Sequence, residues 1–463
     1  MRLKSDKRQN NQQMRLAFSE EYRGEAPKDL VKGTESLVAK HRTESPAKDE
    51  QLIEEVCERE NCKQALARVK ANKGSAGVDR MTVQQLPEFL KQHWPAVREQ
   101  LLSGTYKPQP VKRVEIPKPD GGVRKLGIPT VLDRFIQQAV MQILQCKWDR
   151  TFSEHSYGFR PGRSAHQAVE QAQKYLAEGY RWVVDLDLEK FFDRVNHDKL
   201  MGKIAQRVSD KRMLKLIRVF LTAGVMEDGL VSPVDEGTPQ GGPLSPLLSN
   251  LVLDEWDREL ERRGLRFARY ADDCNLYVRS RRAGERVMAS ATRLLAVKLK
   301  LTVNQQKSAV ARPWERKFLG FSFTRDRQPK RRIAPRALVR FKGRIRELTS
   351  QTRGVSIERM AEELSSCLRG WLGYLGRCQT PSVLRGLEGW SRRRLRSVIW
   401  KQWKRSRVRF GELRRRGVGT ELAAQTVGSS HGPWRIANSP ALALALSNAY
   451  FDSLGIPSLT GGQ

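Results

Sequence analysis

Apolar and polar residues alternate along Arg181–Leu188, a spacing that predicts a β-strand. One side of this strand carries Trp182, Val184, Leu186 and Leu188, and the other side carries Val183, Asp185 and Asp187. Two further β-prone runs, Phe267–Tyr270 and Asn275–Val278, flank a short acidic turn. We therefore expect a hairpin at this turn, with the strand lying beside it.

Longer stretches of the chain space their apolar residues as helices do. A polar, aromatic-poor tail at residues 1–50 is an exception, and we expect it to be mostly disordered, with a short helix near residues 30–40. An Asp-Gly-Gly turn at residues 120–122 predicts a second hairpin. The predicted helical stretches are 51–70, 83–102, 133–178 with an interruption at 156–164, 196–222, one that the block 237–248 opens and that runs to 261, 282–301, 335–419 and 439–454.

The charge of the chain is strongly and unevenly positive. Its 463 residues include 85 Lys and Arg against 51 Asp and Glu, a net charge of +34. Residues 321–420 alone hold 27 Lys and Arg against 7 Asp and Glu. Such an excess indicates a polyanionic partner, most simply a nucleic acid.

Several other classes of protein are disfavoured. The six cysteines form no CxxC pair and no histidine cluster accompanies them, so we expect no zinc site and a reduced, cytoplasmic protein of the bacterial cytosol or nucleoid. No apolar run approaches the ~20 residues of a membrane span, so we expect no membrane partner. The polar, basic N-terminus lacks the apolar core of a signal peptide.

The acidic residues suggest chemistry. Asp272 and Asp273 are adjacent at the predicted turn, where two carboxylates repel each other unless a cation lies between them. If the strand lies beside the hairpin, Asp187 joins them, and three oxygen donors make a site for Mg²⁺. Two such ions are the usual means of in-line phosphoryl transfer. Taken alone, the Asp-Asp pair is equally compatible with a solvated turn.

These acids stand in motifs of a known family. Tyr270-Ala271-Asp272-Asp273, with Asp187–Asp193 upstream, resembles the motifs of reverse transcriptases. The blocks at 116–129, 156–164, 237–248, 318–321 and 432–459 are similar to those of the group II intron-encoded subfamily, the reverse transcriptase/maturases. The resemblance covers about residues 60–459, with the motifs in the expected order.

The resemblance implies an α+β right-hand polymerase, with fingers, a palm and an α-helical thumb/maturase domain. It divides the chain into a basic tail (1–50), an N-terminal extension with fingers (51–180), a palm with the catalytic acids (181–325) and a helical, RNA-binding thumb/maturase domain (326–463).

It also implies roles for individual residues. Asp187, Asp272 and Asp273 would hold two Mg²⁺ ions with help from the backbone carbonyl near Leu188, and Lys307 would serve the leaving pyrophosphate. The residues that would bind the incoming deoxynucleotide are Lys118, Arg124, Phe192 and Gln240. On their residues alone, Lys118 and Arg124 fit a solvated basic hairpin equally well, and Lys307 is one of many lysines.

A further set of residues is expected to bind RNA, because arginines are interleaved with aromatic rings there. Tryptophans in a helical bundle are also common core residues, and that alternative stays open. The RNA-binding candidates are Arg160, Arg163, Trp371, Arg392, Arg393, Arg394, Arg396, Lys404 and Arg405.

The function implied is an RNA-directed DNA polymerase that binds its group II intron RNA, promotes splicing and copies the intron for mobility. The partners implied are the intron RNA, an RNA template with a DNA primer, dNTPs and target DNA, and a homodimer is compatible with the sequence. We expect no Cys/His-rich endonuclease, because one histidine follows residue 197. Two rivals stay open: a domesticated reverse transcriptase in phage defence or repair, and a maturase that only binds RNA and aids splicing.

Overall fold

The computed structural model describes residues 51–117, 122–227, 230–232, 236–237, 241–350 and 352–461. The predictions for the tail at 1–50, for Lys118 and for Gln240 lie outside these residues. The chain divides into two units, the first ending at Arg312 and the second beginning at Pro313.

An antiparallel sheet of four strands, in the order β6-β7-β3-β8, forms the centre of the first unit. The strands are β3 (Trp182–Leu186), β6 (Arg266–Tyr270), β7 (Asp273–Val278) and β8 (Ala309–Ala311). This confirms the predicted strand, the predicted hairpin and their adjacency.

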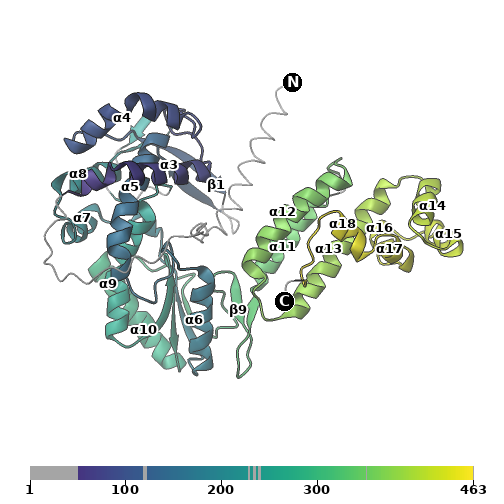
Figure 1. Ribbon diagram of the computed structural model, residues 1–463. Helices are drawn as coiled ribbons and strands as arrows, with labels where there is room; N and C mark the ends of the chain where they lie inside the picture. The colour runs from purple at the N-terminus through teal and green to yellow at the C-terminus, as the bar shows by residue number, and fades with distance from the viewer. Residues whose placement is uncertain are drawn as a thin grey trace, which may run out of the picture. The chain divides into compact units, whose positions relative to one another are not determined.

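Helices cover this sheet (Figure 1). Val184 and Leu276, which pair across β3 and β7, turn to the apolar core, whereas the alternate positions, including Asp187, turn to the opposite face. Helix α10 (Arg281–Leu294) lies close to the strands through Gly284, and a single π-type turn (Leu295–Leu299) extends it. The other covering helices are α6 (Ala165–Ala177) and α9 (Ser245–Arg262).

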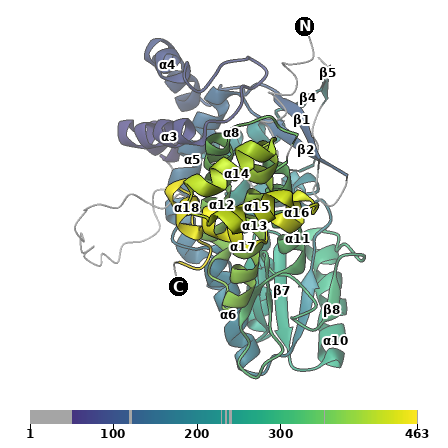
Figure 2. The same cartoon turned by 90° about the vertical axis from the view of Figure 1, so that its right-hand side faces the viewer.

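A second sheet, in the order β2-β1-β4-β5, lies in the same unit (Figure 2). Its strands are β1 (Val111–Pro117), β2 (Val123–Ile128), β4 (Val225–Glu227) and β5 (Leu230–Ser232). Strands β1 and β2 pair antiparallel, so the predicted second hairpin is confirmed in its two arms. The helices α2 (Leu52–Val56), α3 (Arg59–Asn72), α4 (Leu86–Leu102) and α5 (Val131–Trp148) precede and follow these strands in the chain.

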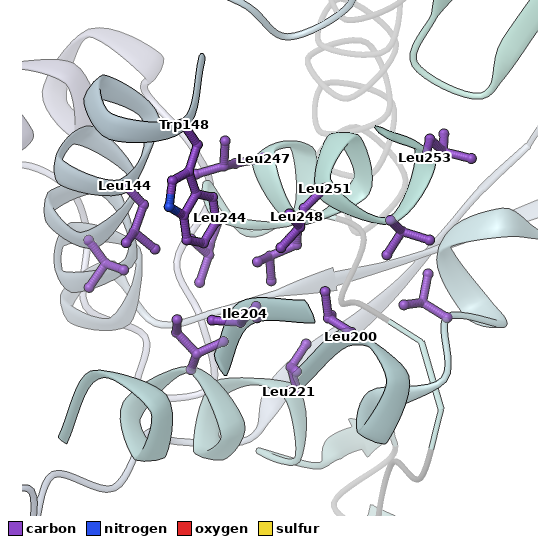
Figure 3. Packing of buried hydrophobic residues seen from close by; sticks show 14 of the residues in the cluster. Leu144, Trp148, Leu200, Ile204, Leu221, Leu244, Leu247, Leu248, Leu251 and Leu253 are labelled. Atoms are coloured by element: carbon purple, nitrogen blue, oxygen red, sulfur yellow. The ribbon is translucent and has the colours of Figure 1, made fainter. Parts of the chain in front are cut away.

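One apolar core connects the helices of this unit to the central sheet. Figure 3 shows its centre, where Leu144 and Trp148 of α5 face the start of α9 at Leu247. Leu200 of α7 (His197–Ala205) and Leu221 of α8 (Lys211–Leu221) approach α9 in the same cluster. Helix α9 therefore has apolar neighbours on several sides. Strand β6 follows α9 directly in the chain.

The second unit opens with a two-stranded sheet, β9 (Phe321–Phe323) and β10 (Arg331–Ile333), and is otherwise helical. Helices α11 (Pro335–Leu348), α12 (Ile357–Leu375), α13 (Pro381–Gln402) and α14 (Ser406–Arg415) confirm the helical stretch predicted for 335–419. The shorter helices are α15 (Thr420–Gly428), α16 (Pro433–Ile436), α17 (Pro440–Ala445) and α18 (Asn448–Ser453).

The single helix predicted for 439–454 is wrong, because the structure has α17 and α18 instead. Leu446 leaves the helical region with φ −122° and ψ 63°. The hydroxyl of Ser447 then accepts a hydrogen bond from the Tyr450 N–H and caps a new helix. None of the helices that the structure describes is long and apolar enough to cross a bilayer.

We predict that Gly284→Ala destabilises the first unit. A Cβ atom at Gly284 would lie 2.5 Å from Cγ1 of Val310, so α10 would have to move away from the sheet. Overpacking of this kind costs about 1–3 kcal/mol. Gly202→Ala in α7 is the matched control, since no atom lies within 4 Å of its added Cβ. Chemical denaturation should show a loss for Gly284→Ala, partly recovered by Val310→Ala, and no loss for Gly202→Ala.

Candidate active site

Three aspartates lie at one end of the central sheet. Leu186 of β3 pairs with Cys274 of β7, and Asp187 and Asp273 flank this last pair. Tyr270 pairs with Asp273 across a turn of two residues, Ala271 and Asp272. Ala271 holds a left-handed backbone with φ 55°, which is uncommon for a residue other than glycine. The register of the sheet therefore brings the predicted acids to one place.

The backbone around Asp187 is fixed by the segment that follows α10. Its carbonyl accepts a hydrogen bond from the Asn304 N–H at 2.8 Å, and its N–H donates to the Ser308 hydroxyl at 3.0 Å. The Glu189 N–H donates to the Thr302 carbonyl at 2.8 Å. Leu188 lies opposite Val303 in this bridge, and the two hydrogen bonds are made by its neighbours Asp187 and Glu189.

The carboxylates oppose one another electrostatically. Partial burial raises the pKa of Asp272, its own backbone hydrogen bond lowers it, and the Asp187 carboxylate raises it further. Arg124 on β2 acts in the opposite direction on the same pKa. The Lys307 ammonium, whose side chain is 65% exposed, lies 3.9 Å from Oδ2 of Asp187. The structure thus brings Arg124 and Lys307 into the electrostatic environment of the acids.

These residues have the donor chemistry that a divalent cation needs. Within the described part of the chain, no three His, Cys, Asp or Glu side chains converge closely enough to enclose a metal ion by themselves. Mg²⁺ does not require such a cage, because it keeps waters and takes substrate phosphates as ligands beside one or two carboxylates. The mutual repulsion of Asp187 and Asp272, together with the nearby Leu188 carbonyl, fits an ion of this kind.

A buried arginine supports the turn that carries the acids. Arg269, 1% exposed, donates through Nε to Oδ1 of Asp257 at 2.7 Å and through Nη1 to the Ala271 carbonyl at 2.9 Å. It also donates to Asn250 on α9 and to the hydroxyl of Ser156. Burial opposes the charge of Arg269, but the Asp257 carboxylate outweighs burial and raises the pKa of Arg269.

The loop from Ser156 to Ser164 packs directly on this turn. A Cβ atom at Gly158 would lie 2.3 Å from the Ala271 nitrogen, so only glycine fits there. The Gly158 carbonyl accepts a hydrogen bond from the Asn250 side chain at 2.8 Å. The loop is therefore a support of the active site, a role that its sequence did not indicate.

Arg160 of this loop does not lie where RNA can reach it, which corrects the expectation. Its side chain is 3% exposed and donates to the Asp149 carboxylate and to the carbonyls of Ser153 and Ser156. Such a guanidinium holds the loop together. Arg163 is half-buried and pairs with Glu154 while its guanidinium lies over the Tyr157 ring.

Phe191 and Phe192 follow β3 on a short 3₁₀ turn (Phe191–Asp193). Phe191 is 2% exposed in the core, whereas Phe192 is half-buried beside it, with ring centroids 5.2 Å apart. Gly237 packs against the same turn, since a Cβ atom there would lie 2.8 Å from the Phe192 carbonyl oxygen. The glycine-rich segment that contains Gln240 thus passes beside Phe192 at Gly237.

Two RNA-binding candidates of the second unit are buried instead. Trp371 is 7% exposed and packs on Phe341, so it belongs to the helical core. Arg392 is 5% exposed and pairs through Nη2 with Glu388 at 2.7 Å and Asp452 at 3.1 Å. Because a buried guanidinium bound to carboxylates has no face for phosphate, these two expectations are corrected.

The remaining candidates divide by exposure. Arg394 donates to the Thr349 hydroxyl and Arg396 to the Leu446 carbonyl, which ties both to neighbouring elements. Arg393 is half-buried and contacts Trp434. Lys404 and Arg405 are exposed between α13 and α14.

Sequence reasoning missed the support formed by Asp257, Asn250 and Arg269. One signal was available: Arg269 interrupts an apolar β-strand next to the acidic turn, and a charge in such a strand needs a partner. The identity of that partner on α9 was not visible in the sequence.

Known proteins match the chain in two regions. The family described as reverse transcriptase (RNA-dependent DNA polymerase) matches residues 116–323, and the group II intron, maturase-specific domain matches residues 338–417. Protein YkfC of Escherichia coli is 35% identical over a region that covers 50% of this chain and 71% of that protein.

The group II intron-encoded protein LtrA of Lactococcus lactis is 41% identical over 37% of this chain, which is 28% of its own length. The solved structure described as a partial Cas6-RT-Cas1–Cas2 complex matches 53% of this chain and 43% of its own at 25% identity, with a TM-score of 0.35. The order of the two matched domains, and the acids that the first domain brings together, agree with the resemblance seen in the sequence. The chain belongs to the group II intron reverse transcriptase/maturase family.

Proposed function

We propose that this protein is an RNA-directed DNA polymerase that binds its group II intron RNA, assists its splicing and copies it into DNA during intron mobility. The observation that carries the proposal is that Asp187, Asp272 and Asp273 all lie at the same end of the central sheet. Around them lie two cations, at Arg124 and Lys307, that suit a triphosphate substrate.

Asp187, Asp272 and Asp273, with the Leu188 carbonyl, would hold two Mg²⁺ ions. Bound ions of this kind lower the pKa of a primer 3′-hydroxyl and neutralise the charge that develops on the transferred phosphate. The chain itself positions these ligands, because the hydrogen bonds of Asn304 and Ser308 fix the backbone of Asp187 and Arg269 fixes the turn of Asp272.

The cationic side chains act on the substrate. Arg124, exposed on β2, is suited to the triphosphate of an incoming dNTP. Lys118, which follows β1 in the sequence, would act with it. Lys307, 3.9 Å from the Asp187 carboxylate, is suited to the leaving pyrophosphate. Phe192 and Gln240 would contact the nucleotide itself, with the ring of Phe192 excluding a ribose 2′-hydroxyl.

The second unit would bind the intron RNA. Its 30 Lys and Arg against 10 Asp and Glu from residue 313 onward give it a net charge of +20, out of +34 for the whole chain. The exposed cations Lys401, Lys404, Arg405 and Arg407 lie in succession where α13 passes into α14. They are the best candidates for phosphate contacts, since neighbouring arginines such as Arg392 serve the fold.

We predict that Asp272→Asn abolishes primer extension without unfolding the protein. Loss of a metal ligand removes several kcal/mol of transition-state stabilisation, so extension of a DNA primer on an RNA template should fall by about 100-fold or more. In EDTA the variant should melt at the same temperature as the wild type or higher, because a carboxylate repelled by Asp187 has been neutralised. Mg²⁺ should raise the melting temperature of the wild type more than that of the variant.

Asp198→Asn is the matched control, because this aspartate is 81% exposed and paired with Arg218 on the surface. Asp198→Asn should leave both primer extension and the melting temperature unchanged. Near-normal extension by Asp272→Asn would show that the acids are not the catalytic centre. If the wild-type protein also fails to extend the primer, the result would favour a maturase that only binds RNA.

We predict that Phe192→Val relaxes sugar selection. Removal of the ring should admit a ribose and raise the use of rNTPs relative to dNTPs at least tenfold, since a relieved clash of a few kcal/mol corresponds to more than a factor of ten. Single-nucleotide extension with matched dNTP and rNTP measures the ratio. Phe191→Ala should leave the ratio unchanged and instead cost about 3–5 kcal/mol of stability, because Phe191 is in the core. If the ratio of rNTP to dNTP use changed only with Phe191→Ala, Phe191 would be the residue that selects the sugar and Phe192 would not.

We predict that replacing Lys401, Lys404, Arg405 and Arg407 together by Ala weakens binding to intron RNA and flattens its salt dependence. Each phosphate contact contributes about 0.7–0.9 to the slope of log affinity against log salt. Four lost contacts should therefore reduce the magnitude of the slope by up to about 3.6. Arg392→Gln should lower stability and leave the slope unchanged. An unaltered slope in the fourfold variant would mean that these cations do not meet RNA.

A further inference from the structure

Trp434 is exposed in a way that the fold does not explain. Its side chain, on the short helix α16, is 41% exposed, whereas Trp400 in α13 is 3% exposed and Trp371 in α12 is 7% exposed. Tryptophan carries the largest apolar surface of any residue, and leaving that surface in water forgoes a large stabilisation. An exposed tryptophan therefore indicates a ligand or partner when its surroundings are also organised.

Arg393 organises those surroundings. Its guanidinium lies over the Trp434 ring, 4.2 Å from the ring centroid. Nε and Nη2 of Arg393 both donate to the Trp434 carbonyl, at 3.1 Å and 2.9 Å. The two hydrogen bonds and the stacking fix the arginine and the indole against each other, with Nη1 outside these bonds. Figure 1 shows α16 beside α13, which carries Arg393.

Several residues that flank Trp434 in the sequence are polar and exposed. His431, Arg435 and Asn438 all have exposed side chains on either side of Trp434 in the sequence. The unit as a whole carries 30 Lys and Arg against 10 Asp and Glu. An exposed indole with a guanidinium stacked on it, in a strongly positive unit, suits an anionic ligand that also has a flat apolar face.

We propose that Trp434 and Arg393 form a stacking site for one unpaired base of RNA. This inference rests on the proposed RNA binding and adds a specific contact to it. Indole stacks on any nucleobase, and a guanidinium fixed beside it adds cation–π attraction and a phosphate contact. A duplex does not fit, because its base faces are already covered by their neighbours. A protein partner is disfavoured by the surrounding positive charge.

The test uses the full chain and two RNA probes of equal length. One is an unstructured single strand, and the other has abasic sugars in place of its bases. Trp434→Leu should weaken binding of the first about tenfold and of the second not at all, because stacking needs a base. The salt dependence should not change, since stacking releases no counterions. A single strand that carries 5-iodouridine should also crosslink to Trp434, as identified by mass spectrometry.

Controls separate stacking from folding. Trp434→Phe keeps an aromatic ring and should retain most of the affinity for the single strand. Leu444→Ala removes another apolar side chain, which is 62% exposed, and should leave that affinity unchanged. Equal affinity of Trp434→Leu and the wild type for the single strand would overturn the proposal, and so would an equal loss on the abasic probe. If either result is found while RNA binding stays salt-dependent, only the stacking site is wrong and the proposed function stands. A wild-type protein that binds neither probe would contradict the proposed function itself.

Discussion

The active site depends on one buried ion pair, between Arg269 on β6 and Asp257 on α9. Both side chains are excluded from water, so each charge requires the other, and removing one partner of such a pair typically costs about 3–5 kcal/mol. The same guanidinium also reaches the Ala271 carbonyl and the Ser156 hydroxyl. A single planar group with several donors thereby connects a helix, a loop and the turn that carries Asp272, which no short side chain can do.

This support matters because the site it holds is electrostatically unfavourable. Burial and, to a smaller extent, the Asp187 carboxylate raise the pKa of Asp272, and Ala271 is held in a left-handed backbone. Both features cost stability locally. The core around α9 and the Arg269 network supply the rigidity that keeps the acids together until substrate and cations arrive.

Arginines of the second unit serve two different purposes. Arg392 is buried against Glu388 and Asp452 and holds α13 to the C-terminal segment. Lys404 and Arg405 are exposed and are suited to phosphate. Arg393 is intermediate, since it is fixed to a neighbour and yet lies at an exposed ring. A large positive charge in a sequence therefore indicates a polyanion without showing which cations reach it.

The sequence by itself determined the elements and the family. Alternation identified β3 and the β6–β7 hairpin, and motif order identified a reverse transcriptase/maturase, because these signals are local and each residue carries its own part of them.

Only the tertiary structure decided which side chains are buried. Arg160, Trp371 and Arg392 had the composition of an RNA-binding surface and lie inside the fold, while Asp257 and Asn250 proved to be the partners of Arg269. The break between α17 and α18 was equally hidden, because one serine cap decides it. Burial and pairing depend on residues distant in the chain, and a single sequence contains no direct record of those contacts.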